Sequence, residues 1–449
     1  MNRLTFINHA SVLIETDKTV LVMDPWVEGT AFNNGWALLD QSTSNDKLYS
    51  TLRTSGKNIV IWYSHEHSDH FTVSFVRGLA SSGLGDVTFL FHRTLDKRVV
   101  IFLRRQGFDA RECDRGEEVG LDDELSITTF PHRESGDSYA LVKIGDKALL
   151  NLNDCRVNTS ERCIPVWNEV HRLTPSVDLL LTQFGYANWI GNEEDFAERQ
   201  EAAKEQRRRI QLQADYFMPR YIIPFASFVY FCHEENRYLN DAQNSLRDVL
   251  EDDLLTDHRE RFIFMKPSDT IDLGDLGKTA ARSGTNAEAI THWEGLARGP
   301  KDMIKPGPSV PLESLSLLAN AYRRRANRAL AMLPYLFELA RIIRPLRIKL
   351  MYSGEMLRLS YITGLSVENT TEFDCSCSSE TLSFILKNDF GFNTTAVNGR
   401  FRASGDVGLR TLNRFFAPQS FVKDGYGWRS PLLSARRLLK NLRAIARFE

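Results

Sequence analysis

Cysteine is scarce in this chain, which has six cysteines in 449 residues: Cys113, Cys155, Cys163, Cys232, Cys375 and Cys377. A disulfide framework is therefore not expected, and the Cys375–Cys377 pair has no second pair with which to form a zinc site. The opening segment MNRLTFINHASVLIE has neither a basic n-region nor a long apolar core. These features predict a reduced, cytoplasmic protein.

Long apolar runs and a strong charge of one sign are also missing. No apolar run approaches the roughly 18 residues of a membrane-spanning helix. The 56 Lys and Arg residues nearly balance the 58 Asp and Glu residues, so a global field that attracts nucleic acid is not expected. With 42% hydrophobic residues the chain can bury a sizeable core. The composition therefore predicts an ordinary globular protein.

Short β-rich runs alternate with helical stretches in the first 230 residues or so, which predicts a layered α/β fold. The best helix candidate is Glu193 to Phe217, which is long, charged and free of Gly and Pro. The expected strands are Leu4 to Ile7, Val12 to Glu15, Val20 to Met23, Ile59 to Tyr63, Val87 to Phe91, Ser126 to Phe130, Ala140 to Ile144, Ala148 to Leu152, Leu179 to Thr182 and Tyr221 to Phe225.

Three regions are predicted along the chain. Residues 1–275 form the α/β domain, and residues 276–311 form a linker, because their second half concentrates Gly and Pro. Residues 312–449 form a C-terminal helical and small α+β region, with a helix over Leu312 to Ile343.

The stretch WYSHEHSDHF, residues 62–71, holds three of the ten histidines of the chain. It follows the apolar strand Ile59 to Tyr63, so the cluster lies in a loop that leaves a buried strand, where sheets often present catalytic groups. Imidazole and carboxylate ligands suit zinc, iron or manganese. Histidines two positions apart can bind one metal while the following Asp-His pair turns to a second. The pattern therefore predicts a dinuclear metal site.

This H-x-H-x-D-H pattern after a strand resembles the signature of the metallo-β-lactamase superfamily. The resemblance implies an αββα sandwich for roughly residues 1–275, followed here by the additional C-terminal region. The flanking segments FINHASVLIET and VLVMDPWVEG resemble the start of the branch that contains ascorbate-phosphate lactonases and N-acyl phosphatidylethanolamine phospholipases. The segments DLLLTQFGYANW (178–189) and RYIIPFASFVYFCHEENRYLND (220–241) resemble the metallo-β-lactamase-like part of CMP-N-acetylneuraminate hydroxylase.

The resemblance implies a ligand set. The first metal would be held by His65, His67 and His132, the second by Asp69 and His70, with Asp154 as the bridging carboxylate. Relatives have a sixth ligand, a histidine directly after the strand that here reads YIIPF, but Phe225, Ala226 and Ser227 stand there. The nearest candidate is His233, so the second metal is either held by His233 or is weakly held or absent.

Other residues are expected around the metals. His9 would line the site without binding metal, and Asp24 would orient a metal-bound imidazole, because such rings usually donate their second N–H to a carboxylate or carbonyl. Gln183, Asn188 and Trp189 are candidates to face the substrate, and a structural role in their loop is the alternative.

Two chemistries fit this ligand set. With zinc, a metal-bound hydroxide oriented by Asp69 would attack a phosphoester, a lactone or an amide, with a sugar or nucleotide sugar as one substrate class. With iron, the same cage would activate oxygen for hydroxylation. The sequence contains no Cys-x-His pairs for a Rieske centre, so an oxygenase would depend on an external reductase. We expect a hydrolase first, an oxygenase second, and a non-catalytic binding module third.

The tail SPLLSARRLLKNLRAIARF, residues 430–448, places leucines along one helical face with basic residues around it. Such a helix either packs on the protein or contacts a membrane surface or an acidic partner. The sequence leaves this choice open, as it does a homodimer.

Overall fold

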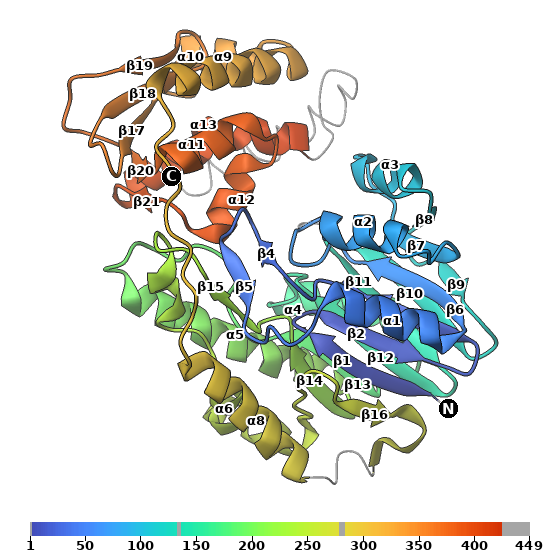
Figure 1. Ribbon diagram of the computed structural model, residues 1–449. Coiled ribbons are helices and arrows are strands. Elements are labelled where there is room, and N and C mark those ends of the chain that lie inside the picture. The colour runs from blue at the N-terminus through green and yellow to red at the C-terminus, as the bar shows by residue number, and fades with distance from the viewer. Residues whose placement is uncertain (1, 133–135, 278–282, 424–449) are drawn as a thin grey trace.

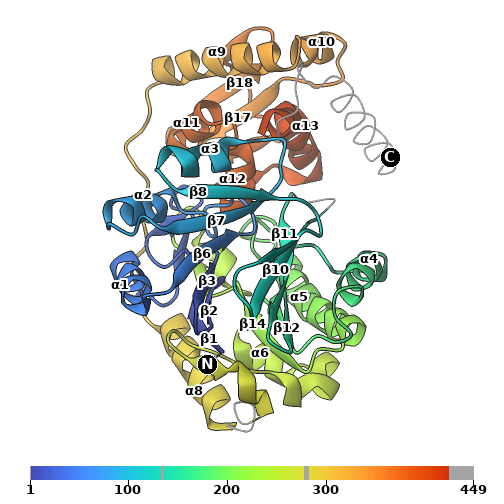
Figure 2. The same cartoon turned by 90° about the vertical axis from the view of Figure 1, so that its right-hand side faces the viewer.

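The computed structural model describes residues 2–132, 136–277 and 283–423. Two β-sheets lie face to face and carry helices on their outer sides, and a third body, formed by the C-terminal residues, lies against one end of this sandwich (Figures 1 and 2). The predicted α/β sandwich with an additional C-terminal region is thus confirmed.

The first sheet has seven strands, and its inner strands are fully or almost fully buried. In spatial order they are β16 (Thr270–Asp272), β1 (Arg3–Asn8), β2 (Ser11–Glu15), β3 (Thr19–Met23), β6 (Asn58–Tyr63), β7 (Val87–His92) and β8 (Asp109–Cys113). From β3 to β8 the strands are parallel. The continuous apolar runs of β3 and β6 suit strands covered on both faces.

The second sheet has six strands. They are β14 (Tyr221–Phe225), β13 (Leu179–Gln183), β12 (Lys147–Asn153), β11 (Ser138–Ile144), β10 (Leu125–Pro131) and β9 (Glu118–Gly120). The pairs β12–β13 and β13–β14 are parallel, and the remaining pairs are antiparallel. All the strands expected from the sequence in both sheets occur within two residues of their predicted bounds.

Three cores hold these layers together. Side chains such as Val12, Trp62, Ile127 and Leu181 come from both sheets and form one cluster between them. On the outside, α1 (Asn45–Ser55), α2 (Val73–Ser81) and α3 (Arg98–Arg105) cover the first sheet, and α4 (Ser160–His171) and α5 (Phe196–Phe217) cover the second. The helix predicted from residue 193 begins three residues later, at Phe196.

A small sheet extends the sandwich toward the C-terminal region. It consists of β15 (Val229–Phe231), β5 (Trp36–Leu38) and β4 (Thr30–Ala31), so it joins the segment after β14 to a hairpin near the N-terminus. This hairpin lies between the sandwich and the C-terminal body (Figure 1).

The predicted linker 276–311 is partly wrong. Residues Ser283–Arg298 form α8, and its Ala289, Ile290 and Trp293 are buried in the core between the sheets. The helices α6 (Leu246–Glu251), η1 (Arg237–Asn240), η2 (Asp253–Arg261) and η3 (Leu273–Asp275) precede it. Only the part after α8 runs as an extended connection to residue 311. The Gly- and Pro-rich stretch therefore marks the end of the first domain rather than an independent linker.

The C-terminal region is an α+β unit with its own hydrophobic core. Its sheet has the order β19 (Gly364–Val367), β18 (Met356–Ser360), β17 (Leu346–Leu350), β20 (Cys375–Cys377) and β21 (Arg402–Ala403). Its helices are α9 (Leu312–Ala329), α10 (Leu333–Leu339), α11 (Ser379–Lys387), α12 (Gly391–Asn398) and α13 (Gly405–Lys423). The helix expected over 312–343 is interrupted because Ala331 and Met332 take left-handed backbone conformations.

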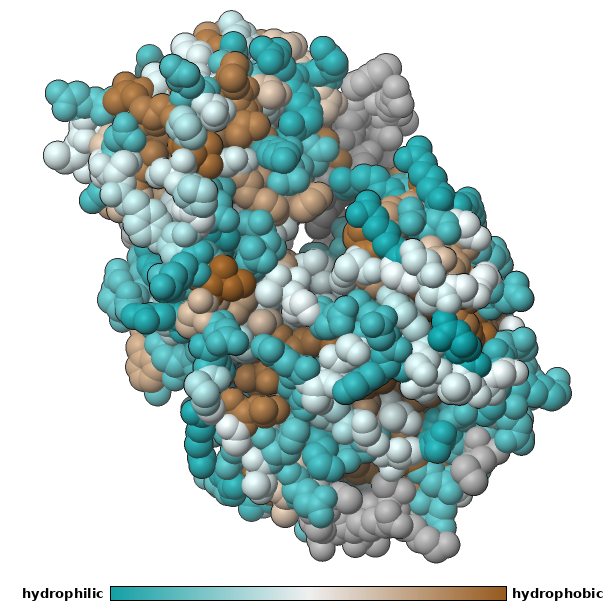
Figure 3. Space-filling view, viewed as in Figure 1, coloured by the Kyte–Doolittle hydropathy of each residue, from teal (hydrophilic) through white to brown (hydrophobic). Residues whose placement is uncertain are grey.

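Most of the surface in Figure 3 is hydrophilic, and apolar residues gather on the C-terminal part, at the top of the view, and in smaller groups lower down. Large exposed apolar side chains of that part include Leu317, Leu336, Leu339 and Ile342. No helix within the described ranges is both long and apolar enough to cross a membrane. The basic amphipathic helix predicted for 430–448 lies outside the described residues.

The packing of α8 generates a stability prediction. Trp293 stacks on Phe228 with ring centroids 4.0 Å apart, and its indole N–H donates to the Met265 carbonyl at 2.9 Å. Trp293→Ala should therefore lower the free energy of unfolding by about 3–5 kcal/mol, measured by urea denaturation. Thr291→Ala on the exposed side of the same helix should change it by less than about 0.5 kcal/mol. Equal, small effects of both variants would mean that α8 contributes nothing to the core.

Candidate metal centre

The histidine-rich loop leaves the end of β6 and turns back at once into the protein. The His70 N–H donates to the His67 carbonyl at 3.0 Å, and the Phe71 N–H donates to the same oxygen at 2.7 Å. This turn buries His65, Asp69 and His70, while Glu66 remains exposed. The loop therefore presents several of its polar side chains to one buried point rather than to solvent.

Three other strand ends meet this loop. β1 is followed by His9, β3 by Asp24, and β12 by Asp154, with Asn153 as its last residue. His9, Asp24 and Asn153 have φ angles of 41°, 45° and 48°, in the left-handed region that non-glycine residues rarely adopt. Each such residue costs on the order of 1–3 kcal/mol and persists only where its surroundings fix it. The backbone is thus strained at these three residues, and this conformation turns their side chains toward the histidine loop.

The imidazoles and carboxylates form three overlapping groups whose possible ligand atoms lie within 4.8 Å of one another. The groups are His9, Asp69 and His70; His65, His70 and Asp154; and His65, His67 and Asp69. Because His65, Asp69 and His70 each belong to two groups, the arrangement is a continuous cluster with room for more than one cation. Nitrogen and carboxylate donors at such separations suit zinc, iron or manganese.

Asp154 lies close to both His65 and His70. Its Oδ2 is 3.4 Å from His70 Nε2 and 3.9 Å from His65 Nε2. On the other side, Asp69 Oδ2 is 3.3 Å from His70 Nε2 and 3.6 Å from His9 Nε2. Both carboxylates therefore lie close to the same nitrogen, His70 Nε2.

Several of these atoms are buried yet make no hydrogen bond within the described part of the chain. They are Nε2 of His9, His65 and His70, Oδ1 of Asp69 and Oδ1 of Asp154. Leaving a buried polar atom unsatisfied costs free energy, and native proteins avoid it unless another partner binds there. The cluster therefore fits a bound metal, which would take these lone pairs.

The partners of His65 define which nitrogen it offers. The Ser64 hydroxyl donates to Asp24 Oδ2 at 2.7 Å and lies 2.9 Å from His65 Nδ1. Since the hydroxyl has a single proton, which Asp24 accepts, His65 Nδ1 must be the protonated nitrogen. The lone pair of His65 is then on Nε2, the atom that faces the cluster.

Asp24 supports the centre from behind. This fully buried carboxylate also accepts from the Ser64 N–H at 2.8 Å and from Asn153 Nδ2, and its Oδ2 lies 3.1 Å from His70 Nδ1. A carboxylate behind a ligand histidine fixes the ring and raises its basicity. This is the geometry expected for the orienting role that we predicted for Asp24.

The charges of the cluster call for a cation. Burial alone would raise the pKa of the Asp69 carboxyl, but His70 and His9 hold that pKa well below its ordinary value. Burial would likewise lower the pKa of His70, yet Asp69, Asp154 and Asp24 hold it well above the ordinary value. Without metal, a proton on His70 thus serves as the positive charge among three carboxylates. A divalent ion would supply that charge and release the proton.

A buried arginine holds the segment that carries Asp154. Arg209 of α5 donates to the carbonyl oxygens of Asn153 and Cys155, at 3.2 and 2.8 Å, and to Gln183 Oε1 at 3.1 Å. Nothing in the sequence distinguished Arg209 from Arg208 next to it. Gln183, for which the sequence left open a role at the substrate or in the structure, is buried and accepts a hydrogen bond from this guanidinium.

Of the two possibilities left open for the sixth ligand, the structure does not favour His233, which is in none of the candidate ligand groups of the described residues. β15 pairs with β5 and carries the chain away, and His233 Nδ1 accepts from the Glu235 N–H at 3.1 Å. His9 stands at the cluster instead, as a member of a candidate ligand group and not only a lining residue. The Ala226 N–H, in the segment where the resemblance implies a histidine, donates to the His9 carbonyl at 2.8 Å.

The remaining predicted residues lie around the cluster or outside it. His132 follows β10, and its N–H donates to the Asp137 carbonyl at 2.7 Å, but the ligand groups found among the described residues do not include its ring. Asp137, which the sequence did not single out, has its Oδ1 4.0 Å from His65 Nε2. Asn188 is exposed and donates to the Trp189 carbonyl, and Trp189 packs against Phe401 of the C-terminal region.

Comparison with known proteins agrees with this fold. Residues 3–141, which include the histidine loop, match the family model of the beta-lactamase superfamily domain. The resemblance to this superfamily that the sequence predicts is thereby confirmed for these residues.

Two curated relatives of this chain carry the same name. It is 24% identical over 259 residues to the cytidine monophosphate-N-acetylneuraminic acid hydroxylase of Danio rerio, covering 53% of this chain and 40% of that protein. It is 24% identical over 293 residues to the Xenopus laevis hydroxylase, covering 61% of this chain and 46% of that protein. The chain thus spans less than half the length of these relatives.

Among solved structures, the chain is similar to CmlA, a diiron β-hydroxylase from Streptomyces venezuelae. The identity is 16%, the TM-score is 0.38, and the alignment covers 61% of this chain and 54% of CmlA.

The Ser64 hydrogen bonds generate a prediction for metal binding. Ser64→Ala removes the acceptor that keeps the proton on His65 Nδ1, so zinc affinity should fall about 10- to 100-fold, measured by competition with a chromophoric chelator. Ser360→Ala removes an equally buried hydroxyl of the C-terminal region and should leave the affinity unchanged. Unchanged affinity of the Ser64 variant would contradict the role assigned to this hydroxyl.

Proposed function

We propose that this protein is a dinuclear metal-dependent enzyme whose centre is the cluster around His70. The observation that carries the proposal is the set of overlapping ligand groups whose buried nitrogen and oxygen atoms have no hydrogen-bond partner in the described structure. A beta-lactamase superfamily domain over residues 3–141 supports it.

The two metals would divide the cluster between them. His65 and His67, together with His132 as the sequence predicts, would hold the first ion. Asp69, His70 and His9 would hold the second, and Asp154 lies between the two sets, within 4 Å of His65 and His70. His9 thus replaces His233 as the proposed sixth ligand. The His9 carbonyl accepts a hydrogen bond from the Ala226 N–H. His9 therefore lies next to the segment after β14, in which the resemblance implies a histidine.

Two divalent ions of zinc, iron or manganese would act as Lewis acids that polarise a substrate oxygen and acidify water. The chain supplies the rest. The Asp69 carboxylate, with its unpartnered Oδ1, would orient the attacking water and accept its proton. The buried walls of the cluster would exclude bulk water and strengthen each of these interactions.

We propose hydrolysis of a phosphoester, a lactone or an amide as the reaction, with a sugar or nucleotide sugar as the substrate class. The substrate class is supported by the name of the curated relatives, which act on a cytidine monophosphate sugar. The reaction class is supported by Asp69, which belongs to two of the candidate ligand groups and has a buried carboxylate oxygen without a hydrogen-bond partner in the described structure.

Oxygen-dependent hydroxylation is the second candidate, and the names of the curated relatives favour it. A histidine and carboxylate cage suits iron as well as zinc. In this case the printed sequence lacks the Cys-x-His ligands of a Rieske centre, so electrons would come from an external reductase.

The assignment of the sixth ligand can be tested with a pair of variants. His9→Asn keeps the left-handed backbone that asparagine tolerates and removes the ring, so about one of two metal equivalents should be lost. His233→Asn should retain both. Metal content is measured by mass spectrometry on protein reconstituted with excess zinc and then desalted. One equivalent lost by the His233 variant, and none by the His9 variant, would return the role to His233.

The reaction class can be tested by the requirement for oxygen. Zinc- or manganese-loaded protein should turn over a panel of phosphoesters, lactones and amides under anaerobic conditions. Asp69→Asn should lower that rate by roughly two to four orders of magnitude, because the attacking water loses its proton acceptor. The metal content of the variant is measured in parallel, so that a lost metal is not mistaken for a lost base. Product formed only with iron, oxygen and a reductant would establish the second candidate. Metal uptake without turnover of any kind would favour a binding protein.

A further inference from the structure

The turn between β4 and β5 has an unusual backbone. Phe32, Asn33 and Asn34 have φ angles of 51°, 55° and 59°, so three consecutive residues other than glycine are left-handed. This conformation costs roughly 1–2 kcal/mol per residue, and only asparagine and aspartate among residues with a side chain relieve part of that cost. Within the turn, the Gly35 N–H donates to the Ala31 and Phe32 carbonyls at 3.0 and 3.1 Å, and contacts from outside add to these bonds.

On one side, the turn contacts the proposed metal centre. The Phe32 N–H donates to Ser68 Oγ, inside the histidine loop, at 2.7 Å. The Phe32 ring meets the His67 ring edge to face, with centroids 5.7 Å apart. Trp36 supports the Phe32 ring from behind at 4.6 Å. The position of the turn therefore limits where His67 can lie.

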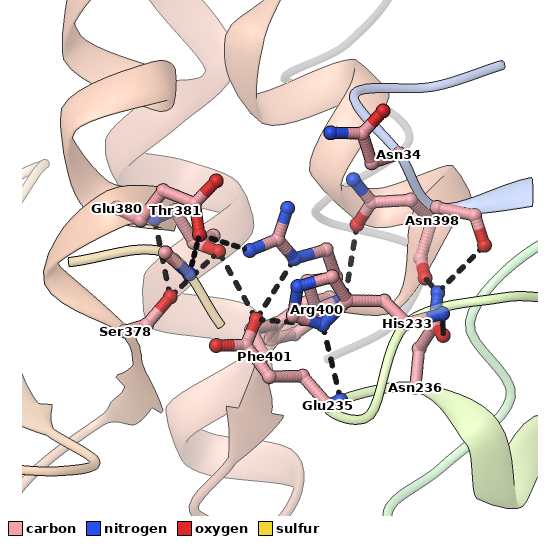
Figure 4. A network of polar contacts seen from close by, with 12 residues as sticks. Asn34, His233, Glu235, Asn236, Ser378, Glu380, Thr381, Asn398, Arg400 and Phe401 are labelled. Atoms are coloured by element: carbon pink, nitrogen blue, oxygen red, sulfur yellow. Dashed lines mark hydrogen bonds and ion pairs between the residues drawn. The ribbon is translucent and has the colours of Figure 1, made fainter. Parts of the chain in front are cut away.

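On the other side, the turn is held by the end of α12 and the residues after it. Asn398 Nδ2 donates to the Phe32 carbonyl at 2.9 Å, and Arg400 Nη1 donates to the Asn33 carbonyl at 3.1 Å. Both Asn398 and Arg400 are fully buried. Gly35 is required at this contact, because a Cβ there would come within 2.2 Å of Asn398 Cβ. In Figure 4, Asn398 and Arg400 lie between the turn that carries Asn34 and the helices of the C-terminal region.

Arg400 is itself fixed from both parts of the molecule. Its Nε donates to Glu235 of the first domain and its Nη2 to Glu380 of α11, each at 2.8 Å (Figure 4). Asn236 donates to the carbonyl oxygens of both Gly35 and Asn398, at 2.9 and 2.6 Å. A buried charge is tolerated only with good partners, and Arg400 has two carboxylates. The turn is thus held by a rigid, fully bonded network.

We propose that Asn398 and Arg400 are positioning residues for the metal centre. They hold residues 32–34 in their left-handed conformation. This conformation keeps Phe32 in contact with His67 and Ser68. The C-terminal region is then part of the working site, although none of its described residues belongs to a candidate ligand group. The inference rests on the proposed function for its catalytic meaning, but the mechanical link from Asn398 to the histidine loop can be tested without metal.

The test measures amide hydrogen exchange by mass spectrometry on the metal-free full chain. Asn398→Ala removes the bond to the Phe32 carbonyl, and exchange in residues 30–36 and 64–71 should accelerate roughly tenfold. Asn327→Ala is the matched control, since Asn327 is also a buried asparagine of the C-terminal region but donates to Tyr361. It should leave both segments unchanged. Gly35→Ala disturbs the same contact from the turn side and replaces Asn398→Ala if that variant does not fold.

A second change separates positioning from general loss of structure. Asn33→Gly lowers the cost of the left-handed turn, so adding it to Asn398→Ala should restore slow exchange in residues 64–71. Zinc affinity, measured by calorimetry, should fall in Asn398→Ala and recover in the double variant. Unchanged exchange in 64–71, or an increase spread equally over the chain and repeated by Asn327→Ala, would overturn the proposal. If the wild-type chain binds no zinc, the proposed function fails, while the exchange result still decides whether the link exists.

Discussion

The constraint on which this structure depends is the burial of acidic groups and imidazoles at one point between two sheets. Asp24, Asp69 and Asp154 meet His70 in a place from which bulk water is largely excluded. Charged groups in such surroundings are costly unless opposite charge accompanies them. The parallel course of β3 and β6, and the same direction of β1, deliver these groups to a single edge. The two-sheet fold therefore brings these strand ends, and the polar groups that follow them, close together.

Hydrogen bonds stabilise the fold at the ends of the strands that carry these groups. Left-handed residues follow or end β1, β3 and β12, and each is tied to its neighbours: Asp24 accepts from Ser64 and Asn153, and the Asn153 carbonyl accepts from Arg209. Such bonds compensate for backbone strain and lock the rotamers of the residues that face the cluster. The supporting residues come from the first sheet, the second sheet and α5. Loss of one of these hydrogen bonds would therefore make the candidate metal centre less rigid but would leave the hydrophobic core intact.

Much of this could be predicted from the sequence because the signals are local. The run Ile59 to Tyr63 is apolar, branched and aromatic, and the strand β6 occupies almost the same residues. The histidine motif directly after it identified the loop that carries His65, His67, Asp69 and His70. Asp154 was implied by the resemblance to the metallo-β-lactamase superfamily. The prediction of the histidine loop needed only the spacing of residues and the type of side chain.

What could not be predicted depends on the path of the chain in space. His233 follows β14 by a few residues, yet the pairing of β15 with β5 takes it to Glu235, and His9 of the N-terminal strand stands at the cluster. Within the run Arg207 to Arg209, only tertiary structure selects Arg209 to be buried beneath Asp154. The helix α8 was missed because a Gly- and Pro-rich stretch follows it and outweighed its own weak pattern.

The interface between the two parts of the molecule links these non-local features. Surface ion pairs contribute little to stability, but Arg400 lies fully buried between carboxylates from both parts and bonds the turn that contacts His67. An interface built only for adhesion would use apolar contacts, whereas this one uses directional bonds that fix a strained backbone. Directional bonds define position more sharply than hydrophobic contact does, because they fail when the partners shift by a fraction of an ångström. The C-terminal region therefore contributes geometry to the metal-binding loop in addition to its own stability.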